Sequence, residues 1–188
     1  MNPILAKNLA ALETVNSPFA RRIANRRDRD TEENPFRYSG IVTAKNGSPV
    51  PVFQDGSSIH SLFNPEREAR QLVETLKGPC FAFFAGLGGA YHIREFLSRY
   101  PASACIVAEA GLCAITSLLE AIDLSDILAD SRVTVIADCS EDAVTTLLLE
   151  RYVPSICGNF CLVPIRAWQV RNARIYDDLA RWINVALK

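Results

Sequence analysis

A glycine-rich turn and the carboxylate that follows it are the residues of this sequence with the clearest potential chemistry. Gly86, Gly88 and Gly89 come directly after one apolar run, and Glu109 ends the next apolar run. In dinucleotide-binding folds, glycines at this place let a pyrophosphate approach the backbone, and an acid at the end of the second strand binds a ribose hydroxyl. His92 would lie in the first turn of the following helix, where it can contact a phosphate. These five residues are our candidate ligand-binding residues.

The pattern departs from known ligand-binding motifs at two positions. The dinucleotide motif has a third glycine where this sequence has Tyr91, and the first motif of S-adenosylmethionine methyltransferases has an acid where this sequence has Phe84. Two interpretations stay open: a nucleotide or adenosyl ligand at this turn, or a purely architectural turn. For His92 the alternative to a phosphate contact is an exposed, solvated side chain. We expect no cofactor, with S-adenosylmethionine or a nucleotide as the alternative.

The elements around these residues alternate between strand and helix. Residues 80–85 form a continuous apolar run, which is typical of a strand buried on both faces of a parallel sheet. A helix over 90–100 and a strand that ends at Glu109 follow. Strands over 132–137 and 159–163 then alternate with helices over 112–122, 141–152 and 171–187. Asp138 and Ser140 are candidate caps of the 141–152 helix. The alternation predicts an α/β, Rossmann-like fold with a mostly parallel sheet flanked by helices.

Residues 1–77 are predicted to precede this sheet as an N-terminal helical segment, a small antiparallel β-meander and a connecting helix. Apolar residues at helical spacing indicate a helix over 2–25, which Ser17-Pro18 would divide. The pairs Asn46-Gly47 and Asp55-Gly56 suit type I′ turns and would separate strands over 36–44, 49–54 and 57–62. Asn64 is placed to cap the connecting helix. We therefore divide the chain into 1–77 and a Rossmann-like α/β domain over 78–188, which together form one compact unit.

Composition limits the classes of protein to which this chain can belong. Its 188 residues are 49% hydrophobic, which is enough for one sizeable core, and the formal net charge of −1 gives no general affinity for nucleic acid. The arginines between positions 21 and 29 are interleaved with acids, which indicates a solvated face or linker rather than a phosphate site. We find neither a signal peptide nor an apolar run that could cross a membrane. We expect a cytoplasmic protein without nucleic-acid or membrane partners.

The cysteines and histidines do not form a metal or catalytic motif. The six cysteines include no CxxC pair, and with two histidines a zinc site is poorly supported. We expect reduced cysteines that pack as small hydrophobes, including Cys113, although its place near a helix start could lower its pKa. His60 is expected to bond to turn backbone, the alternative being contact with a ligand or partner domain. The sequence suggests no Ser/His/Asp set.

The order of local signatures resembles the N-terminal domain of the motility accessory factor glycosyltransferases, a flagellin-modifying family that includes the domain-of-unknown-function-115 proteins. The matching segments are 8–12, 44–50, 59–69, 84–93, Glu109 and 122–133. Together these segments span most of the chain. The resemblance implies a Rossmann-like domain of a family thought to act in the cytoplasm. Members transfer a nonulosonic acid, such as pseudaminic or legionaminic acid, from its CMP-activated form to Ser or Thr of flagellin.

The resemblance implies that the catalytic motifs of that family lie in a following domain, and we expect this sequence to end before it. We therefore assign no catalytic residue and leave open whether the chain is an enzyme. A related branch resembles 6-hydroxymethylpterin diphosphokinase, but we expect the domain that carries this similarity to be absent as well. The partners implied are a catalytic glycosyltransferase domain, in the same or another chain, and flagellin. The chain could thus be the N-terminal part of a longer protein.

Two hypotheses of different classes follow. The first is a noncatalytic domain that docks onto a catalytic glycosyltransferase domain or helps to recruit flagellin. It predicts an exposed apolar patch, for example on the final helix or around Trp168 and Trp182, because an interface without its partner leaves such a surface. The second is a divergent methyltransferase-like domain that binds S-adenosylmethionine or a nucleotide through Gly86, Gly88 and Glu109.

Overall fold

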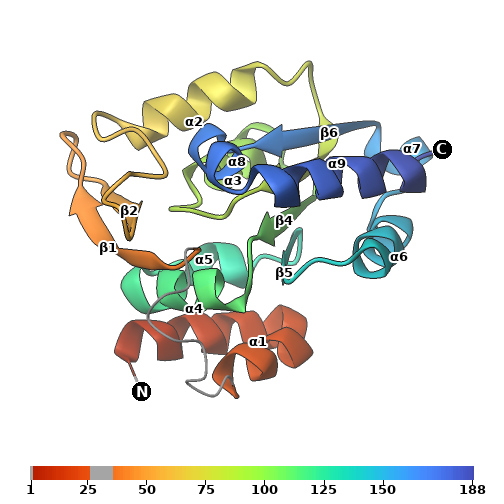
Figure 1. The fold of residues 1–188 in the computed structure, drawn as a ribbon. Helices are drawn as coiled ribbons and strands as arrows, with labels where there is room; N and C mark the ends of the chain where they lie inside the picture. The colour runs from red at the N-terminus through yellow and green to blue at the C-terminus, as the bar shows by residue number, and fades with distance from the viewer. Residues whose placement is uncertain (1, 26–35) are drawn as a thin grey trace.

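The computed structural model describes residues 2–25 and 36–188 of the chain. Its centre is a sheet of four parallel strands in the order β5-β4-β3-β6 (Figure 1). The strands are β3 (Cys80–Ala85), β4 (Cys105–Glu109), β5 (Val133–Ala137) and β6 (Asn159–Pro164). The predicted α/β fold with a parallel sheet is confirmed. Arginines 26, 27 and 29 of the basic run, and its acids at 28, 30, 32 and 33, lie outside the described residues.

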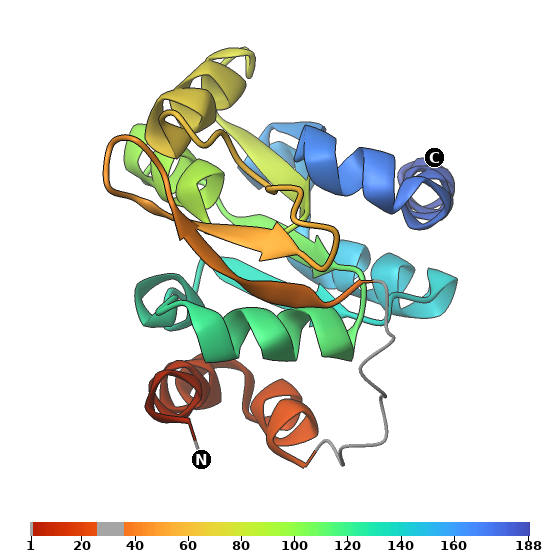
Figure 2. The same cartoon turned by 60° about the vertical axis from the view of Figure 1, so that its left-hand side comes forward.

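Helices cover both faces of this sheet, as Figure 2 shows. The first two crossovers, through α3 (Tyr91–Arg99) and α4 (Leu112–Ala121), lead from β3 to β4 to β5. The chain then returns through α6 (Glu141–Arg151) to place β6 on the free side of β3. Because parallel crossovers are right-handed, this reversal puts α6 on the face opposite to α3 and α4. The last helix, α9 (Ala173–Ala186), packs beside α6.

The central strand β3 is buried along its whole length. Its side chains are at most 2% exposed, and Phe81, Phe83 and Phe84 are among the largest fully buried residues. A strand with neighbours on both sides and helices on both faces has to be apolar at every position, which explains its continuous apolar sequence. The amphipathic helix α2 (Pro65–Glu74) leads into β3 and packs on α3. Asn64 caps α2 as predicted, with its side-chain oxygen accepting from the N–H of Arg67.

The predicted meander is a two-stranded hairpin. β1 (Tyr38–Thr43) pairs with β2 (Pro49–Phe53), whereas the expected third strand contributes only one isolated bridge, from Ser58 to Val52. The turns also differ from type I′, because Gly47 and Gly56 have positive φ but the residue before each does not. Gly47 donates to the carbonyl of Ala44, which is typical of a three-residue loop with a left-handed glycine at its end.

The C-terminal part of the chain contains three short helices that the sequence analysis missed. These are α5 (Ser125–Leu128), α7 (Pro154–Cys157) and α8 (Arg166–Arg171). The predicted final helix therefore begins two residues later than expected, at Ala173, after a break at Asn172. Ser140 caps α6 as predicted, but Asp138 instead accepts from the N–H of Leu112 at the start of α4. Among the described helices, none has the length and apolar character needed to cross a membrane.

The N-terminal helix α1 (Pro3–Ala24) packs against α4 and α5, outside the helical layer that covers the sheet (Figures 1 and 2). Its predicted break is present, one residue earlier than expected: Asn16 leaves helical geometry and accepts from the N–H of Phe19. The fully buried Asn8 fixes the helix in place. It donates to the carbonyls of Leu119 and Ile122 and accepts from the N–H of Leu124. One amide thus satisfies three backbone groups at the end of α4.

We predict that Asn8→Ala lowers the free energy of unfolding by about 3 kcal/mol, because it leaves buried backbone groups without partners. Urea unfolding followed by circular dichroism measures this loss. Asn184→Ala on the exposed surface of α9 is the matched control and should change stability by less than about 0.5 kcal/mol. Equal effects of the two substitutions would contradict the anchoring role of Asn8.

Candidate functional site

The sequence-predicted residues meet at the carboxyl end of the sheet, next to the point where the strand order reverses between β3 and β6. Open α/β sheets bind ligands in the crevice at this point. The glycine turn, 86–89, follows β3 there, and Glu109 is the last residue of β4. The β1–β2 hairpin lies across these strand ends (Figure 2). The Tyr91 hydroxyl, at the start of α3, ties the hairpin down by donating to the carbonyl of Pro49 over 2.6 Å.

Glu109 is buried, with 1% of its surface exposed, and donors of the chain itself surround its carboxylate. Oε1 accepts from the indole N–H of Trp168 at 2.6 Å and from the backbone N–H of Ala110 at 2.9 Å. Oε2 accepts from the N–H of Leu87 at 3.1 Å and from the Tyr38 hydroxyl at 3.3 Å. Burial raises the pKa of Glu109, and these four hydrogen bonds oppose the rise. The oxygens that would hold a ribose are thus occupied.

The glycine turn is covered by side chains of the same chain. A Cβ on Gly86 would lie 2.9 Å from Cγ of Trp168, and the φ of Gly86 is +106°. A Cβ on Gly88 would lie 2.5 Å from Nε2 of His60, and the N–H of Gly89 donates to that same nitrogen at 2.9 Å. These glycines therefore have a packing reason that needs no ligand, because an indole and an imidazole approach the backbone closely.

His60 forms the backbone hydrogen bond that we expected, although the turn concerned is the glycine turn rather than its own. Since Nε2 accepts from Gly89, the ring proton is on Nδ1, which faces Oε2 of Glu68 at 3.5 Å. The same Oε2 accepts from the N–H of Ser61 at 2.9 Å. The contact between His60 and Glu68 thus connects α2 to the glycine turn.

His92 is neither solvated nor at the surface, so the expectation of an exposed side chain is wrong. Its ring is 1% exposed and packs edge-on against Phe84. Nε2 lies 3.2 Å from the carbonyl of Gly86, which can only accept, so Nε2 carries the proton. Burial lowers the pKa of His92 to about 3. The ring is therefore neutral near pH 7, and its Nδ1 has no hydrogen-bond partner among the described residues.

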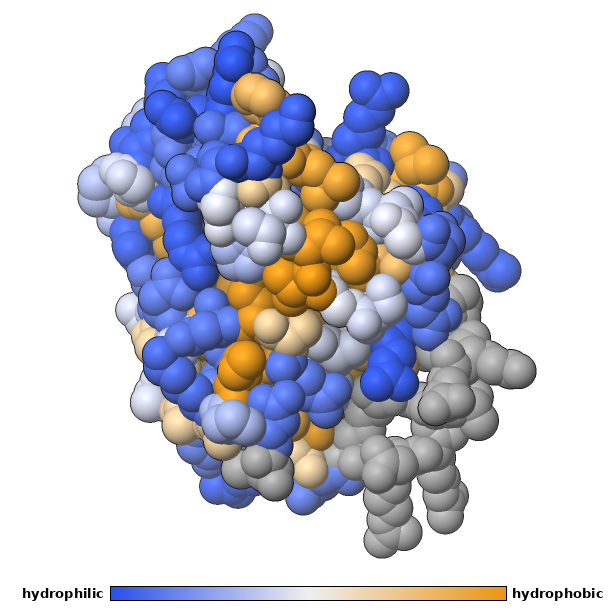
Figure 3. Space-filling view, turned by 90° about the vertical axis from the view of Figure 1, so that its left-hand side faces the viewer, coloured by the Kyte–Doolittle hydropathy of each residue, from blue (hydrophilic) through white to orange (hydrophobic). Residues whose placement is uncertain are grey.

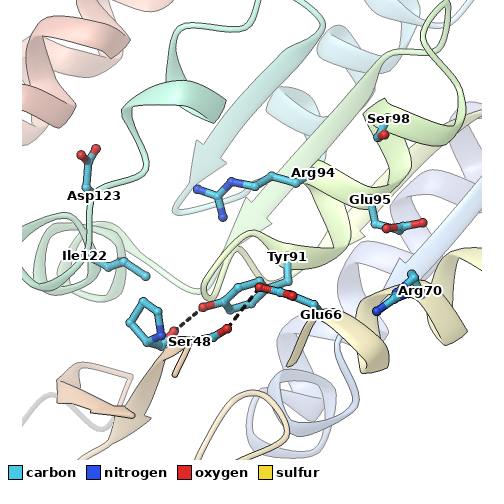
Figure 4. A pocket seen from close by; sticks show the side chains of 10 residues that line it. Ser48, Glu66, Arg70, Tyr91, Arg94, Glu95, Ser98, Ile122 and Asp123 are labelled. Carbon is cyan, nitrogen blue, oxygen red and sulfur yellow. Dashed lines mark hydrogen bonds between the residues drawn. The ribbon is translucent and has the colours of Figure 1, made fainter. Parts of the chain in front are cut away.

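A groove of about 740 Å³ lies along α3, between the hairpin, α2 and the residues that directly follow α4 (Figure 4). Its walls carry both charges, including Glu66, Arg70 and Asp123. Arg94 in this groove is already engaged, since it binds both carboxylate oxygens of Asp126 and the carbonyl of Gly89. The part of the chain that the structure describes contains no group of three or more His, Cys, Asp or Glu side chains that could hold a metal ion.

The structure brings all five predicted site residues together but adds groups that sequence reasoning missed. Trp168, which we expected in an exposed patch, is fully buried on the glycine turn, and that expectation is wrong. Tyr38 is 2% exposed and stacks on Phe53 at 4.9 Å between ring centroids. No local pattern places either residue beside Glu109, which is remote in the sequence. A ligand at Gly86, Gly88, Gly89, His92 and Glu109 stays a prediction.

The three comparisons with known proteins give one match. No protein-family model matches the chain, and no curated protein sequence does. A solved structure, that of the MAf glycosyltransferase from Magnetospirillum magneticum AMB-1, superimposes with a TM-score of 0.56 at 12% sequence identity. The match covers 97% of this chain and 36% of that protein. At this identity the similarity establishes a common fold, and this chain spans little more than a third of the length of its structural neighbour.

We predict that Glu109→Ala lowers the free energy of unfolding by about 3–5 kcal/mol, because three buried N–H groups lose their acceptor. Urea denaturation followed by tryptophan fluorescence measures the loss. Glu150→Ala, an exposed acid on α6, is the control and should stay within about 0.5 kcal/mol of the parent. A Glu109 variant as stable as this control would show that the carboxylate does not hold the site together.

The depressed pKa of His92 predicts a specific pH dependence of stability. Below about pH 6.5 the unfolded chain binds a proton here that the folded chain does not, so the free energy of unfolding falls as pH falls towards 3. Between about pH 7.5 and about pH 5 this loss amounts to ~2 kcal/mol. His92→Gln keeps an N–H for the carbonyl of Gly86 but does not titrate. Over the same pH range, the free energy of unfolding of this variant should therefore fall by ~2 kcal/mol less than that of the parent protein. Urea unfolding at the two pH values tests this, and parallel pH profiles would contradict a buried neutral His92.

Proposed function

We propose that this chain is a noncatalytic, Rossmann-like domain that works together with a glycosyltransferase domain of the motility accessory factor type. The observation that carries this proposal is the closed carboxyl end of the sheet. Where related folds hold a nucleotide, the Trp168 indole covers the glycine turn and the carboxylate of Glu109 accepts four internal hydrogen bonds. In this proposal, a sheet whose carboxyl end is filled by side chains of its own chain serves as a scaffold.

The structural neighbour supports the association with a glycosyltransferase. That protein is a MAf glycosyltransferase, and a domain with the fold of this chain makes up 36% of it. In our proposal the transfer of a nonulosonic acid from its CMP-activated form to Ser or Thr of flagellin takes place on a catalytic domain outside this chain. The proposed partners are that domain, in the same or another chain, and flagellin, and the proposed compartment is the cytoplasm.

Exposed apolar side chains give the domain surfaces for docking. Val185 on α9 is 57% exposed, Leu187 directly after that helix is 41% exposed, and Ile156 on α7 is 83% exposed. The face that carries the β1–β2 hairpin has apolar side chains gathered at its centre (Figure 3). The exposed apolar residues of the hairpin and of the segment after it are Val42, Leu62 and Phe63. Such surfaces are what the docking hypothesis requires.

The alternative, a methyltransferase-like domain that binds S-adenosylmethionine or a nucleotide, rests on one observation. Glu109 and the glycine turn are adjacent, with the N–H of Leu87 3.1 Å from Oε2 of Glu109. This is where an adenosyl ligand would be held if Trp168 and Tyr38 moved aside.

Thermal unfolding with S-adenosylmethionine or CMP separates the two functions. We expect no shift in Tm at millimolar ligand, because the turn is covered and Glu109 is occupied. A bound ligand at about 100 times its Kd would add ~2.7 kcal/mol and raise Tm on the order of 5–10 °C. A shift of this size that Glu109→Gln abolishes would favour the ligand-binding alternative.

The association with a glycosyltransferase is tested in the source cell. Deleting the coding region of residues 1–188 should remove the sugar mass from flagellin, as measured by intact-mass spectrometry, and a plasmid copy should restore it. An immunoblot against this chain shows whether the native product is larger than 20.7 kDa, which distinguishes a partner domain in the same chain from a separate one. Flagellin of unchanged mass after the deletion would refute the proposed function.

A further inference from the structure

The strand β6 is the last strand on its side of the sheet, and no described strand pairs with its outer side (Figure 1). The N–H of Ile165, directly after β6, donates to the carbonyl of Ala85 in β3. Because the backbone groups of a strand point alternately to its two sides, every second residue back from Ile165 also faces β3. The residues between them, Phe160 and Leu162, therefore direct their N–H and C=O groups away from the sheet.

These outward N–H and C=O groups of Phe160 and Leu162 form what we call the free edge of β6. Both residues are partly exposed, whereas no residue of the central strand β3 is more than 2% exposed. Within the part of the chain that the structure describes, no hydrogen bond engages their outward groups. Pro164, the third outward position, has no N–H, and proline in a sheet is typical of an edge strand. Such an edge is a template on which a further strand can pair.

The opposite edge of the sheet, at β5, is less accessible. The carbonyl of Arg132 accepts from the N–H of Cys105 in β4, so by the same alternation Val133 and Val135 face outward. Their exposed fractions are only 5% and 3%. A strand added to this sheet would therefore pair with β6.

A cavity of about 320 Å³ lies at the carboxyl end of β6, between this strand and α2. Its lining is largely apolar and includes Ala69 and Leu72 of α2, with Pro164 and Ile165 at the end of β6. Peptides that add a strand to a sheet gain affinity from backbone hydrogen bonds, and pockets for alternate side chains give specificity. An added strand on β6 would have this cavity beside it, with room for an apolar side chain.

The lining of this cavity also carries one acid and one base, Glu68 and Arg166. Glu68 is engaged within the chain, because its Oε2 accepts from the N–H of Ser61 at 2.9 Å and lies 3.5 Å from Nδ1 of His60. Arg166, at the start of α8, is exposed and has neither a hydrogen bond nor an ion pair with any described residue. The charge left to be matched is therefore positive, and a carboxylate on the ligand would pair with this guanidinium.

We propose that the free edge of β6 and the cavity beside α2 bind an extended peptide segment in which an apolar residue is next to an aspartate or glutamate. The segment pairs as a further strand with the outward groups of Phe160 and Leu162. It places its apolar side chain in the cavity and its carboxylate against Arg166. This inference goes beyond the proposed function, since it names a peptide ligand and its binding surface whichever protein supplies the segment.

The probe for this surface is the palindromic peptide acetyl-Asp-Leu-Thr-Val-Thr-Leu-Asp-amide, which presents the same order of side chains in either direction along β6. In the free protein, the amide hydrogens of Phe160 and Leu162 should exchange rapidly with solvent, because they are not hydrogen-bonded. Saturation of the full chain with the peptide should slow the exchange of both amides, as measured by NMR.

Two N-methylated versions of the peptide test the backbone pairing itself. One carries the methyl groups on both threonines, and the other carries them on the two leucines and the valine. Successive residues of a strand face opposite sides, so only one version directs its methyl groups at β6. That version should bind at least about tenfold more weakly than the unmodified peptide, whereas the other should keep its affinity.

Substitutions in the full chain complete the experiment. Leu162→Pro removes an outward N–H that no described residue uses and should weaken binding of the peptide by about tenfold or more. Leu162→Thr keeps this N–H and, as the matched control, should stay within about threefold of the parent. Arg166→Gln should weaken binding at low salt and have less effect at high salt, whereas Arg174→Gln, at an exposed position of α9 outside the cavity, should not change it.

Three results would overturn the proposal. One is equal binding of the two N-methylated peptides, or no binding of the unmodified peptide at millimolar concentration. Another is protection of the Phe160 and Leu162 amides in the free monomer. The third is a dimer in sedimentation velocity that Leu162→Pro dissociates, since a second copy of the chain would then cover the edge. If Leu162→Pro does not fold, the N-methylated peptides still decide on the unaltered protein.

Discussion

The carboxylate of Glu109 has to be neutralised or hydrogen-bonded, because it is buried at the end of a strand with almost no access to water. Four donors meet this requirement, and they come from four parts of the chain: Tyr38 in the hairpin, Leu87 in the glycine turn, Ala110 after β4 and Trp168 in α8. Removing the partners of a buried charge costs far more free energy than the intact interaction contributes to stability. The hairpin, the glycine turn and α8 therefore have to keep the arrangement in which all four donors reach the carboxylate of Glu109.

This requirement explains why the chain has glycines at a turn that need not touch a ligand. The Trp168 indole that donates to Glu109 packs directly on the turn, and Gly86 leaves the space that a Cβ would take. His60 approaches Gly88 and Gly89 in the same way from the other side. Glycines that admit a pyrophosphate in other folds here admit aromatic side chains. The same short sequence is therefore compatible with binding a ligand and with packing against aromatic side chains, and only the surrounding structure distinguishes the two.

Local chemistry determined what could be predicted from the sequence. The all-apolar run of β3, the Asn64 cap and the alternation of strands and helices depend on neighbouring residues, and these predictions were confirmed. The errors involve partners far apart in the chain. Asp138 looked like a cap for the next helix but accepts from the start of α4, and Trp168 looked like interface surface because nothing nearby indicated its bond to Glu109. The six residues of α8 were too few for a periodic pattern to predict a helix.

The start of the glycine turn is hydrogen-bonded to two buried side chains, even though the crevice at the carboxyl end of the sheet is filled. The carbonyl of Gly86 holds Nε2 of His92, and the next residue, Leu87, donates to Glu109. The carbonyl of Gly86 and the N–H of Leu87 belong to one peptide group, so this single unit holds the His92 ring through its oxygen and the Glu109 carboxylate through its N–H. Since hydrogen bonds in a low-dielectric interior polarise one another, the bond between His92 and Gly86 and the bond between Leu87 and Glu109 strengthen each other, and together they fix the start of the glycine turn.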